Sequence, residues 1–264
     1  MPAREVSRVK LYGTEIELIR GGAGRPLLIL HGPWGNPGWL GWLDRIGDDF
    51  DVYLPTHPGF GNSPRHPGLE TIHDLVDFYL EFLDHFGLDR PALMGFSLGG
   101  WLAAELAATR PDRLDRLVLV DAAGLRIEAA SIADIFLATK PELMALCFHR
   151  AESVPELARL CPETPSEEES AARERSQIMA QVLAWKPYMH NPKLAYRLHR
   201  IRLPTLVVWG RQDGFVPPAH GEAYARAIPG AVLKVIDRCG HAPHIERPAE
   251  FAAAVREFLA PGRS

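Results

Sequence analysis

The segment from Gly95 to Gly99 constrains the fold of this chain more than any other stretch. Its sequence, Gly-Phe-Ser-Leu-Gly, fits the G-x-S-x-G nucleophile elbow, a tight turn that presents a serine between a strand and a helix. Residues 92–94 form an apolar run typical of a buried strand, and apolar side chains recur at helical spacing from residue 101 onwards. The segment therefore predicts that Ser97 is a nucleophile at a helix N-terminus, where main-chain N–H groups attract negative charge.

Apolar, strand-like runs alternate with amphipathic, helix-like segments along most of the chain. Strands are expected at residues 6–11, 14–20, 27–30, 51–54, 92–94, 117–120, 206–209 and 232–236. The alternation predicts an α/β protein with a mostly parallel eight-stranded sheet and helices on both faces. Because ligands bind outside the carboxyl ends of such strands, the loops that follow them are expected to share one functional rim.

The alternation stops between residues 126 and 201, where only helical patterns occur. Ser166 and Glu169 are spaced as a capping box at the start of one of these helices. A helical insertion that leaves the sheet and returns to it at the rim must lie over the rim. We therefore expect a core domain of residues 1–125 and 202–264 and an all-helical lid of residues 126–201, inserted before the seventh strand. A peripheral helical decoration is the alternative.

The serine requires a base, because a hydroxyl is a poor nucleophile at neutral pH. His241 follows the last expected strand and so lies at the rim, whereas His244, three residues further on, is expected to be a wall or structural residue. The base in turn needs a buried carboxylate that fixes its tautomer and orientation. Asp213 follows the strand at 206–209 and is our candidate. Asp121 also ends a strand and is its rival, with a turn or cap as the expected role.

These motifs make the chain resemble the α/β-hydrolase superfamily almost from end to end. Besides the elbow, the resemblance rests on His31-Gly32, residues 57–63 (HPGFGNS), residues 110–114 (RPDRL), residues 204–213 (PTLVVWGRQD) and Gly240-His241. The order Ser97, Asp213, His241 is the order of the catalytic triad in that superfamily. The resemblance is to the lidded branch of esterases, C–C bond hydrolases, haloalkane dehalogenases and epoxide hydrolases. The last two carry an aspartate at the elbow, so the serine argues against both.

The resemblance implies a serine hydrolase that cleaves a carboxylic ester of a small to medium, largely apolar substrate. Ser97 would form the acyl-enzyme, His241 would transfer protons and Asp213 would orient His241. A C–C bond hydrolase acting on a ring-fission product is one alternative, although Ala242 stands where those enzymes usually place an aromatic residue. A ligand-binding receptor with little turnover is an alternative of another class. His57 stands where the family often has aspartate.

The oxyanion hole needs two N–H donors, and the resemblance implies that Leu98 supplies one. The second commonly follows the His-Gly pair, but here that residue is Pro33, which has no N–H. We therefore expect Trp34 N–H to be the second donor, with Pro33 fixing the loop; an incomplete hole is the alternative.

Candidate substrate-binding residues come from the rim and from the lid. They are His31, Gly32, Phe96, Phe136, Phe148, Trp185 and Met189, and the lid also offers Met144 and Met179. Each lid side chain could equally belong to the core of the lid.

Composition and charge argue against several other classes. A net charge of −4 gives no electrostatic footprint for nucleic acid, and no apolar run is long enough to span a bilayer. The N-terminal residues lack the apolar core of a signal peptide, so a cytoplasmic protein is expected. The three cysteines have no close spacing and suggest neither a disulfide framework nor a metal site. We expect a small-molecule substrate and no cofactor or metal.

Overall fold

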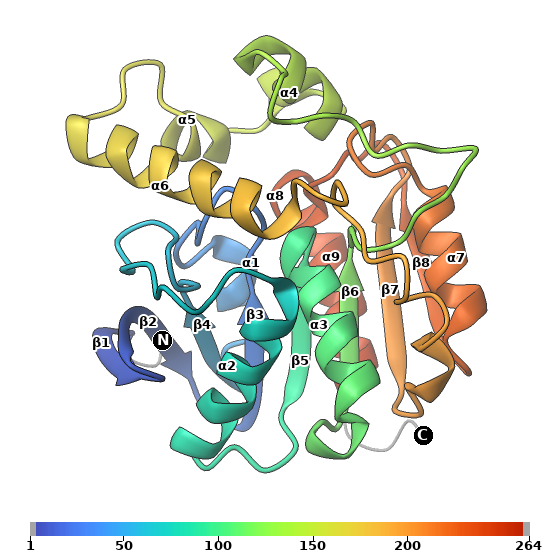
Figure 1. The fold of residues 1–264 in the computed structure, drawn as a ribbon. Helices are drawn as coiled ribbons and strands as arrows, with labels where there is room; N and C mark the ends of the chain where they lie inside the picture. Colours follow the sequence, from blue (N-terminus) through green and yellow to red (C-terminus); the bar gives the residue numbers. More distant parts are fainter. Residues whose placement is uncertain (1–3, 261–264) are drawn as a thin grey trace.

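The computed structural model describes residues 4–260, and an eight-stranded sheet runs through their centre (Figure 1). The strands are β1 Glu5–Leu11, β2 Thr14–Gly22, β3 Arg25–Leu30, β4 Phe50–Pro55, β5 Ala92–Phe96, β6 Leu117–Val120, β7 Thr205–Gly210 and β8 Val232–Ile236. Their spatial order is β1-β2-β4-β3-β5-β6-β7-β8. The pairs β1–β2 and β2–β4 are antiparallel and the other five are parallel, which confirms the predicted mostly parallel sheet.

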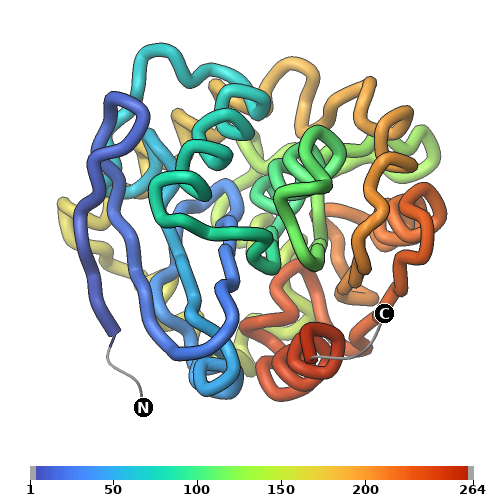
Figure 2. Tube along the Cα trace, turned by 90° about the horizontal axis from the view of Figure 1, so that it is seen from below, coloured from blue at the N-terminus to red at the C-terminus, as the bar shows by residue number. Residues whose placement is uncertain are grey.

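Helices cover both faces of the sheet (Figure 2). One face carries α2 Ile72–His85, α3 Leu98–Thr109 and α7 Ala219–Ala227, and the other carries α1 Gly41–Asp44 and α9 Pro248–Leu259. Successive residues of a strand point to opposite faces. In β6, Leu117 and Leu119 pack into the core beneath α2 and α3, while Val118 and Val120 pack into the core beneath α1 and α9. The continuous apolar runs thus reflect strands that are buried on both sides.

Only helices occur between β6 and β7, and all but the last of them, a short 3-10 helix that packs against α3 and α7, lie across the carboxyl ends of the strands (Figure 1). They are α4 Lys140–Cys147, α5 Glu156–Leu160 and α6 Glu167–Ala184, with 3-10 helices η2 Ala151–Ser153 and η3 Leu198–Arg200. At the start of α6, Ser166 Oγ accepts a hydrogen bond from Glu169 N–H at 3.2 Å, and the Glu169 carboxylate accepts one from Ser166 N–H at 2.8 Å. The capping box expected at this position is present.

The chain returning from these helices is fixed to the helix that follows the elbow. Glu105, on α3, is fully buried. Its carboxylate accepts hydrogen bonds from Asn191 Nδ2 at 2.7 Å and from Trp101 Nε1 at 3.1 Å, and it forms an ion pair with Arg197. A buried carboxylate is tolerated only when such donors satisfy it. The contact therefore anchors the return segment to the helix that begins beside Ser97.

Candidate active site

Ser97 lies in a strained turn between β5 and α3. Its φ and ψ angles are 54° and −114°, and positive φ is rare for residues with a side chain. The flanking glycines allow this turn. A Cβ atom on Gly95 would lie 2.1 Å from the carbonyl oxygen of Gly99, and a Cβ on Gly99 would lie 2.3 Å from the carbonyl oxygen of Leu30. Only glycine fits at either position, and the strand, turn and helix expected around Ser97 are all present.

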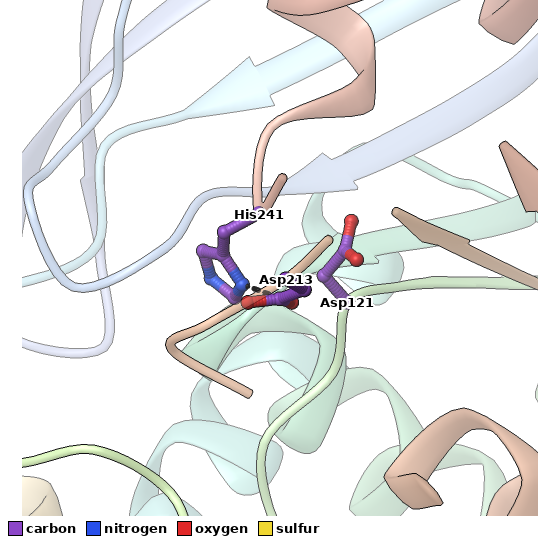
Figure 3. Close-up of side chains that lie close together, drawn as sticks. All are labelled: Asp121, Asp213 and His241. Carbon is purple, nitrogen blue, oxygen red and sulfur yellow. Dashed lines mark hydrogen bonds and ion pairs between the residues drawn. The ribbon is translucent and has the colours of Figure 1, made fainter. Parts of the chain in front are cut away.

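The structure joins His241 to Asp213. His241 Nδ1 donates a hydrogen bond of 2.7 Å to Asp213 Oδ2, which Figure 3 shows as a dashed line. The other oxygen of Asp213 accepts hydrogen bonds from the N–H groups of Phe215 and Val216, both at 2.9 Å. With Nδ1 as the donor, Nε2 is the unprotonated nitrogen of neutral His241. This is the tautomer that a general base requires.

Ser97 and His241 line the same cavity, and each has one polar side-chain atom that makes no hydrogen bond within the described part of the chain. Both residues are buried, and neither Ser97 Oγ nor His241 Nε2 has a hydrogen-bond partner within residues 4–260. Hydrogen bonds between a nucleophile and its base are often long without substrate and tighten during the reaction. The structure therefore places the three predicted residues around one site, with the Asp–His contact formed.

Asp121 also lies at this site, on the far side of Asp213 from His241 (Figure 3). It is 1% exposed, its φ is 44°, and its Oδ1 accepts a hydrogen bond of 2.9 Å from Gly210 N–H. Burial and the nearby charge of Asp213 raise the pKa of Asp121 well above its usual range. Asp121 does not bond His241, so the structure favours Asp213 as the orienting acid.

One cluster of potential metal ligands is found within residues 4–260, and it consists of Asp121, Asp213 and His241. One ligand atom each from Asp121, Asp213 and His241 lies within 4.8 Å of the others. However, His241 Nδ1 carries a proton that it donates to Asp213, and Asp213 already accepts three hydrogen bonds. The ligand atoms of His241 and Asp213 are therefore already engaged in hydrogen bonds.

The loop after β3 runs directly beside the nucleophile. A Cβ built on Gly32 would lie 3.4 Å from Ser97 Cβ, so the main chain of Gly32 touches the elbow. The loop turns tightly, because Gly35 N–H bonds the Gly32 carbonyl at 3.3 Å. The half-exposed ring of Trp34 lies 6.3 Å from the His241 ring and 5.8 Å from the Phe215 ring, measured between centroids. Residues 32–35 thus span the site from the serine to the histidine.

Two buried histidines fix the start of this loop through hydrogen bonds. His31 Nδ1 donates to the Gly32 carbonyl at 2.8 Å, and His31 Nε2 accepts from His57 N–H at 2.9 Å. His57 Nε2 donates to the His31 carbonyl at 3.1 Å, and its Nδ1 accepts from the Tyr79 hydroxyl. Every ring nitrogen is therefore satisfied with both imidazoles neutral. His31 supports the loop, and His57 performs this task where the family often has aspartate.

These imidazoles predict a loss of stability in acid. Burial lowers the pKa of His31 from 6.5 to about 4 and that of His57 well below 6.5. Between those values the unfolded chain binds more protons than the folded chain, so the free energy of unfolding falls as the pH falls. His31 alone should contribute about 3 kcal/mol to this loss. Chemical denaturation from pH 6.5 down to pH 4 measures it.

Matched variants show whether the buried rings cause that slope. His31→Asn should flatten it, whereas His85→Asn, at an exposed position of α2, should leave it unchanged. A wild-type stability that stays constant or rises on acidification would contradict the neutral state of the buried pair.

A cavity of about 600 Å³ lies between the sheet rim and the helices above it. Ser97 and His241 line it together with the predicted residues His31, Gly32, Phe96, Phe136 and Phe148. Met144 also lines it, and so do three cations from the helical segment, Lys140, Arg159 and Arg173. The cavity wall includes His244, whose ring lies 4.2 Å from that of Phe96. His244 is thus a wall residue, as expected.

Two of the predicted substrate-binding residues do not line this cavity, and the structure corrects them. Met189 is fully buried, and its main chain bonds Gly124 and Ala184. Trp185 is 53% exposed at the outer surface, where its ring lies 5.9 Å from that of Phe136. Met179 packs on Gly59 instead. These side chains belong to the core or the outside of the helical segment.

Cys147 lies beside the triad, since its carbonyl accepts a hydrogen bond from His241 N–H at 2.7 Å. Burial and the surrounding carboxylates raise the pKa of its thiol. A thiol held in its neutral form is a weak nucleophile. Cys147 therefore does not compete with Ser97, although it lines the same cavity.

Comparison with known families agrees with this geometry. Residues 25–248 match the family described as alpha/beta hydrolase fold, and the chain belongs to this family. It is a hydrolase-type enzyme with the mostly parallel sheet of that fold. No helix within residues 4–260 has the length and apolar character needed to cross a membrane.

The chain is similar to proteins named as esterases and to a protein named as a 2-hydroxymuconate semialdehyde hydrolase. It is 29% identical to the pimeloyl-[acyl-carrier protein] methyl ester esterase of Aeromonas salmonicida, over 92% of this chain and 99% of that protein. It is 31% identical to the 2-hydroxymuconate semialdehyde hydrolase of Pseudomonas sp. strain CF600, over 94% and 91%. A solved structure of a thermophilic esterase from Thermogutta terrifontis is 28% identical, with a TM-score of 0.74 over 98% of both chains.

Proposed function

We propose that this protein cleaves carboxylic esters through an acyl-enzyme formed on Ser97. The observation that carries the proposal is the 2.7 Å hydrogen bond from His241 to Asp213, at the cavity that Ser97 also lines. This bond leaves His241 Nε2 unprotonated and without another hydrogen-bond partner in residues 4–260, so that it can act as the base. The similarity to two esterases supports the same activity.

In the proposed reaction, Ser97 Oγ attacks the ester carbonyl carbon and its proton passes to His241 Nε2. The tetrahedral intermediate collapses, and the leaving alkoxide takes that proton and departs as the alcohol. Water then attacks the acyl-enzyme and gives a proton to Nε2, which returns it to Ser97 as the acid is released. Asp213 stabilises the imidazolium in both halves.

The negative charge on the intermediate needs main-chain donors. Leu98 begins α3, so its N–H has no partner within the helix and can serve as one. We propose Trp34 N–H as the second, since Pro33 has none and Gly32, which begins this tight turn, lies against Ser97. The segment of residues 126–201 would act as the lid that closes the cavity and excludes water.

The Trp34 proposal predicts that its main chain matters and its side chain does not. Trp34→Ala keeps the N–H, so kcat should stay within about tenfold of wild type, whereas loss of a donor costs about 10²–10³. A crystal structure with a phosphonate on Ser97 should place Trp34 N–H about 2.7–3.1 Å from the phosphoryl oxygen. An N–H turned away from that oxygen would refute the assignment.

A C–C bond hydrolase is the second candidate, and two observations favour it. The 31% identical relative is named a 2-hydroxymuconate semialdehyde hydrolase, and Lys140, Arg159 and Arg173 line the cavity. Arg173 donates a hydrogen bond to the Leu160 carbonyl and Lys140 donates one to the Pro162 carbonyl. Carboxylates lie near two of the three cations, because Arg159 pairs with Glu156, and hydrogen bonds from Ser166 together with the charge of Arg173 lower the pKa of Glu169. Such cations could hold the acidic group of a ring-fission product or of a half-ester.

A substrate panel separates these functions. We expect p-nitrophenyl butyrate to be hydrolysed with a higher kcat/KM than a ring-fission dienoate. Comparing a neutral methyl ester with the monomethyl ester of a dicarboxylic acid then tests the cations, and Arg173→Gln should reduce only the preference for the acidic ester. Faster cleavage of the dienoate would establish the C–C hydrolase, and binding without turnover would establish a receptor.

A further inference from the structure

Asp121 and Asp213 place two carboxyl groups together in the interior. Asp121 is 1% exposed and Asp213 is 4% exposed, and one oxygen of each lies within 4.8 Å of the other. The positive φ of Asp121, at the end of β6, is a conformation that costs free energy and requires support from its surroundings. Two carboxylates this close and this deeply buried do not both ionise near neutral pH. One of them must keep its proton.

The hydrogen bonds show which one keeps it. Asp213 accepts three, from His241 Nδ1 and from the N–H groups of Phe215 and Val216. Asp121 accepts one, from Gly210 N–H, and its Oδ2 has no partner among the N–H and O–H groups of residues 4–260. Donors stabilise the ionised form of a carboxyl group, so three donors outweigh one. The charge therefore resides on Asp213.

We propose that Asp121 is a protonated carboxylic acid whose Oδ2–H donates a hydrogen bond to the Asp213 carboxylate, and that it acts as a positioning residue for the triad. A proton on Oδ2 gives this buried atom the partner that it otherwise lacks. Asp121, which follows β6, then links to the end of β7 through two hydrogen bonds. It accepts one from Gly210 N–H and donates one to the Asp213 carboxylate. The tests that measure activity rest on the proposed function, whereas the protonation of Asp121 can be tested without it.

The other ionisable groups around the pair agree with this assignment. Glu246, from α8 Pro243–Glu246, accepts hydrogen bonds from the N–H groups of Gly240 and His149, one on each carboxyl oxygen. Burial raises the pKa of the thiols of Cys147, on α4, and of Cys239, so both stay neutral. The charges of Asp213 and Glu246 add to burial in keeping the proton on Asp121.

The isosteric variant Asp121→Asn tests the charge of Asp121. An amide is neutral and can still accept from Gly210 and donate to Asp213, so we expect kcat within about threefold of wild type and an acid limb of the kcat/KM profile at the same pH. Had Asp121 been ionised, the variant would remove a negative charge close to His241. The acid limb would then move to lower pH by about one unit or more, and the proposal would be overturned.

Two further readouts separate positioning from a merely structural role. The infrared difference spectrum between wild type and Asp121→Asn should contain the C=O band of a protonated carboxyl group, whatever the protein's activity. Asp121→Leu removes the donor, so kcat should fall about tenfold and the acid limb should move to higher pH, because the Asp213 charge is less shared. An absent infrared band, or a Leu variant that loses only thermal stability, would refute the proposal. Absence of esterase activity in wild type would refute the proposed function instead.

Discussion

Replacing Ser97 with alanine is expected to reduce ester hydrolysis by at least about a thousandfold and to leave the fold intact. The attack step is lost with the hydroxyl, and the rate that remains comes from binding and the oxyanion donors alone. Alanine adds no atoms to a turn that already holds a side chain at a φ of 54°, so unfolding should be unaffected. Steady-state kinetics with p-nitrophenyl butyrate measure the loss.

Ser176 provides a matched control for this experiment. It is the other serine that lines the cavity, and its hydroxyl bonds Gly61 N–H and the Ala172 carbonyl. Ser176→Ala should retain hydrolysis within a few-fold, although the loss of these bonds should cost about 1 kcal/mol of stability. A fluorophosphonate should label wild type and Ser176→Ala at Ser97. Full activity in Ser97→Ala would contradict the proposed mechanism.

The second large effect is expected from Asp213→Asn. An amide in place of the carboxylate removes the charge that stabilises the imidazolium and favours the wrong tautomer of His241. In the serine protease triad that serves as the general reference, this change lowers kcat by roughly 10⁴. Asp213 accepts three hydrogen bonds here, two of them from main-chain N–H groups that an Asn oxygen can retain. We therefore expect a folded protein with a turnover reduced by a similar factor.

The neighbouring carboxyl group decides how this result is interpreted. Asp121→Asn changes the same atoms in the same buried cluster but leaves the Asp–His bond in place. Its effect on kcat should be smaller than that of Asp213→Asn by at least about a hundredfold. If Asp121→Asn were the more damaging variant, Asp121 would be the orienting acid.

The fold and the centre of the site could be predicted because they follow from strand ends. In a parallel sheet, residues just after the strands share one rim, so Ser97, Asp213 and His241 are close in space although far apart in sequence. The short spacing from Gly95 to Gly99 restricts the elbow to one geometry. The structure puts Asp213 in contact with His241 for this reason.

The helical segment was less predictable, because periodicity does not say what a helix face packs against. Phe136 and Phe148 line the cavity, whereas Met189 packs into the core and Trp185 lies at the outer surface. All four are large apolar residues without a strand end to place them. The roles of Asp121 and His57 could not be predicted either. The protonation of Asp121 and the hydrogen bonds of the His57 ring both depend on neighbours that are distant in sequence.

The most direct test of an acyl-enzyme on Ser97 is to trap and locate it. Wild-type protein mixed with excess p-nitrophenyl butyrate and quenched in acid within one turnover should gain the mass of one butyryl group. Peptide mapping by mass spectrometry should place that group on Ser97, and Ser97→Ala should show no gain. A butyryl group on another residue, or hydrolysis by wild type with no covalent species during an observed burst of p-nitrophenol, would contradict the account.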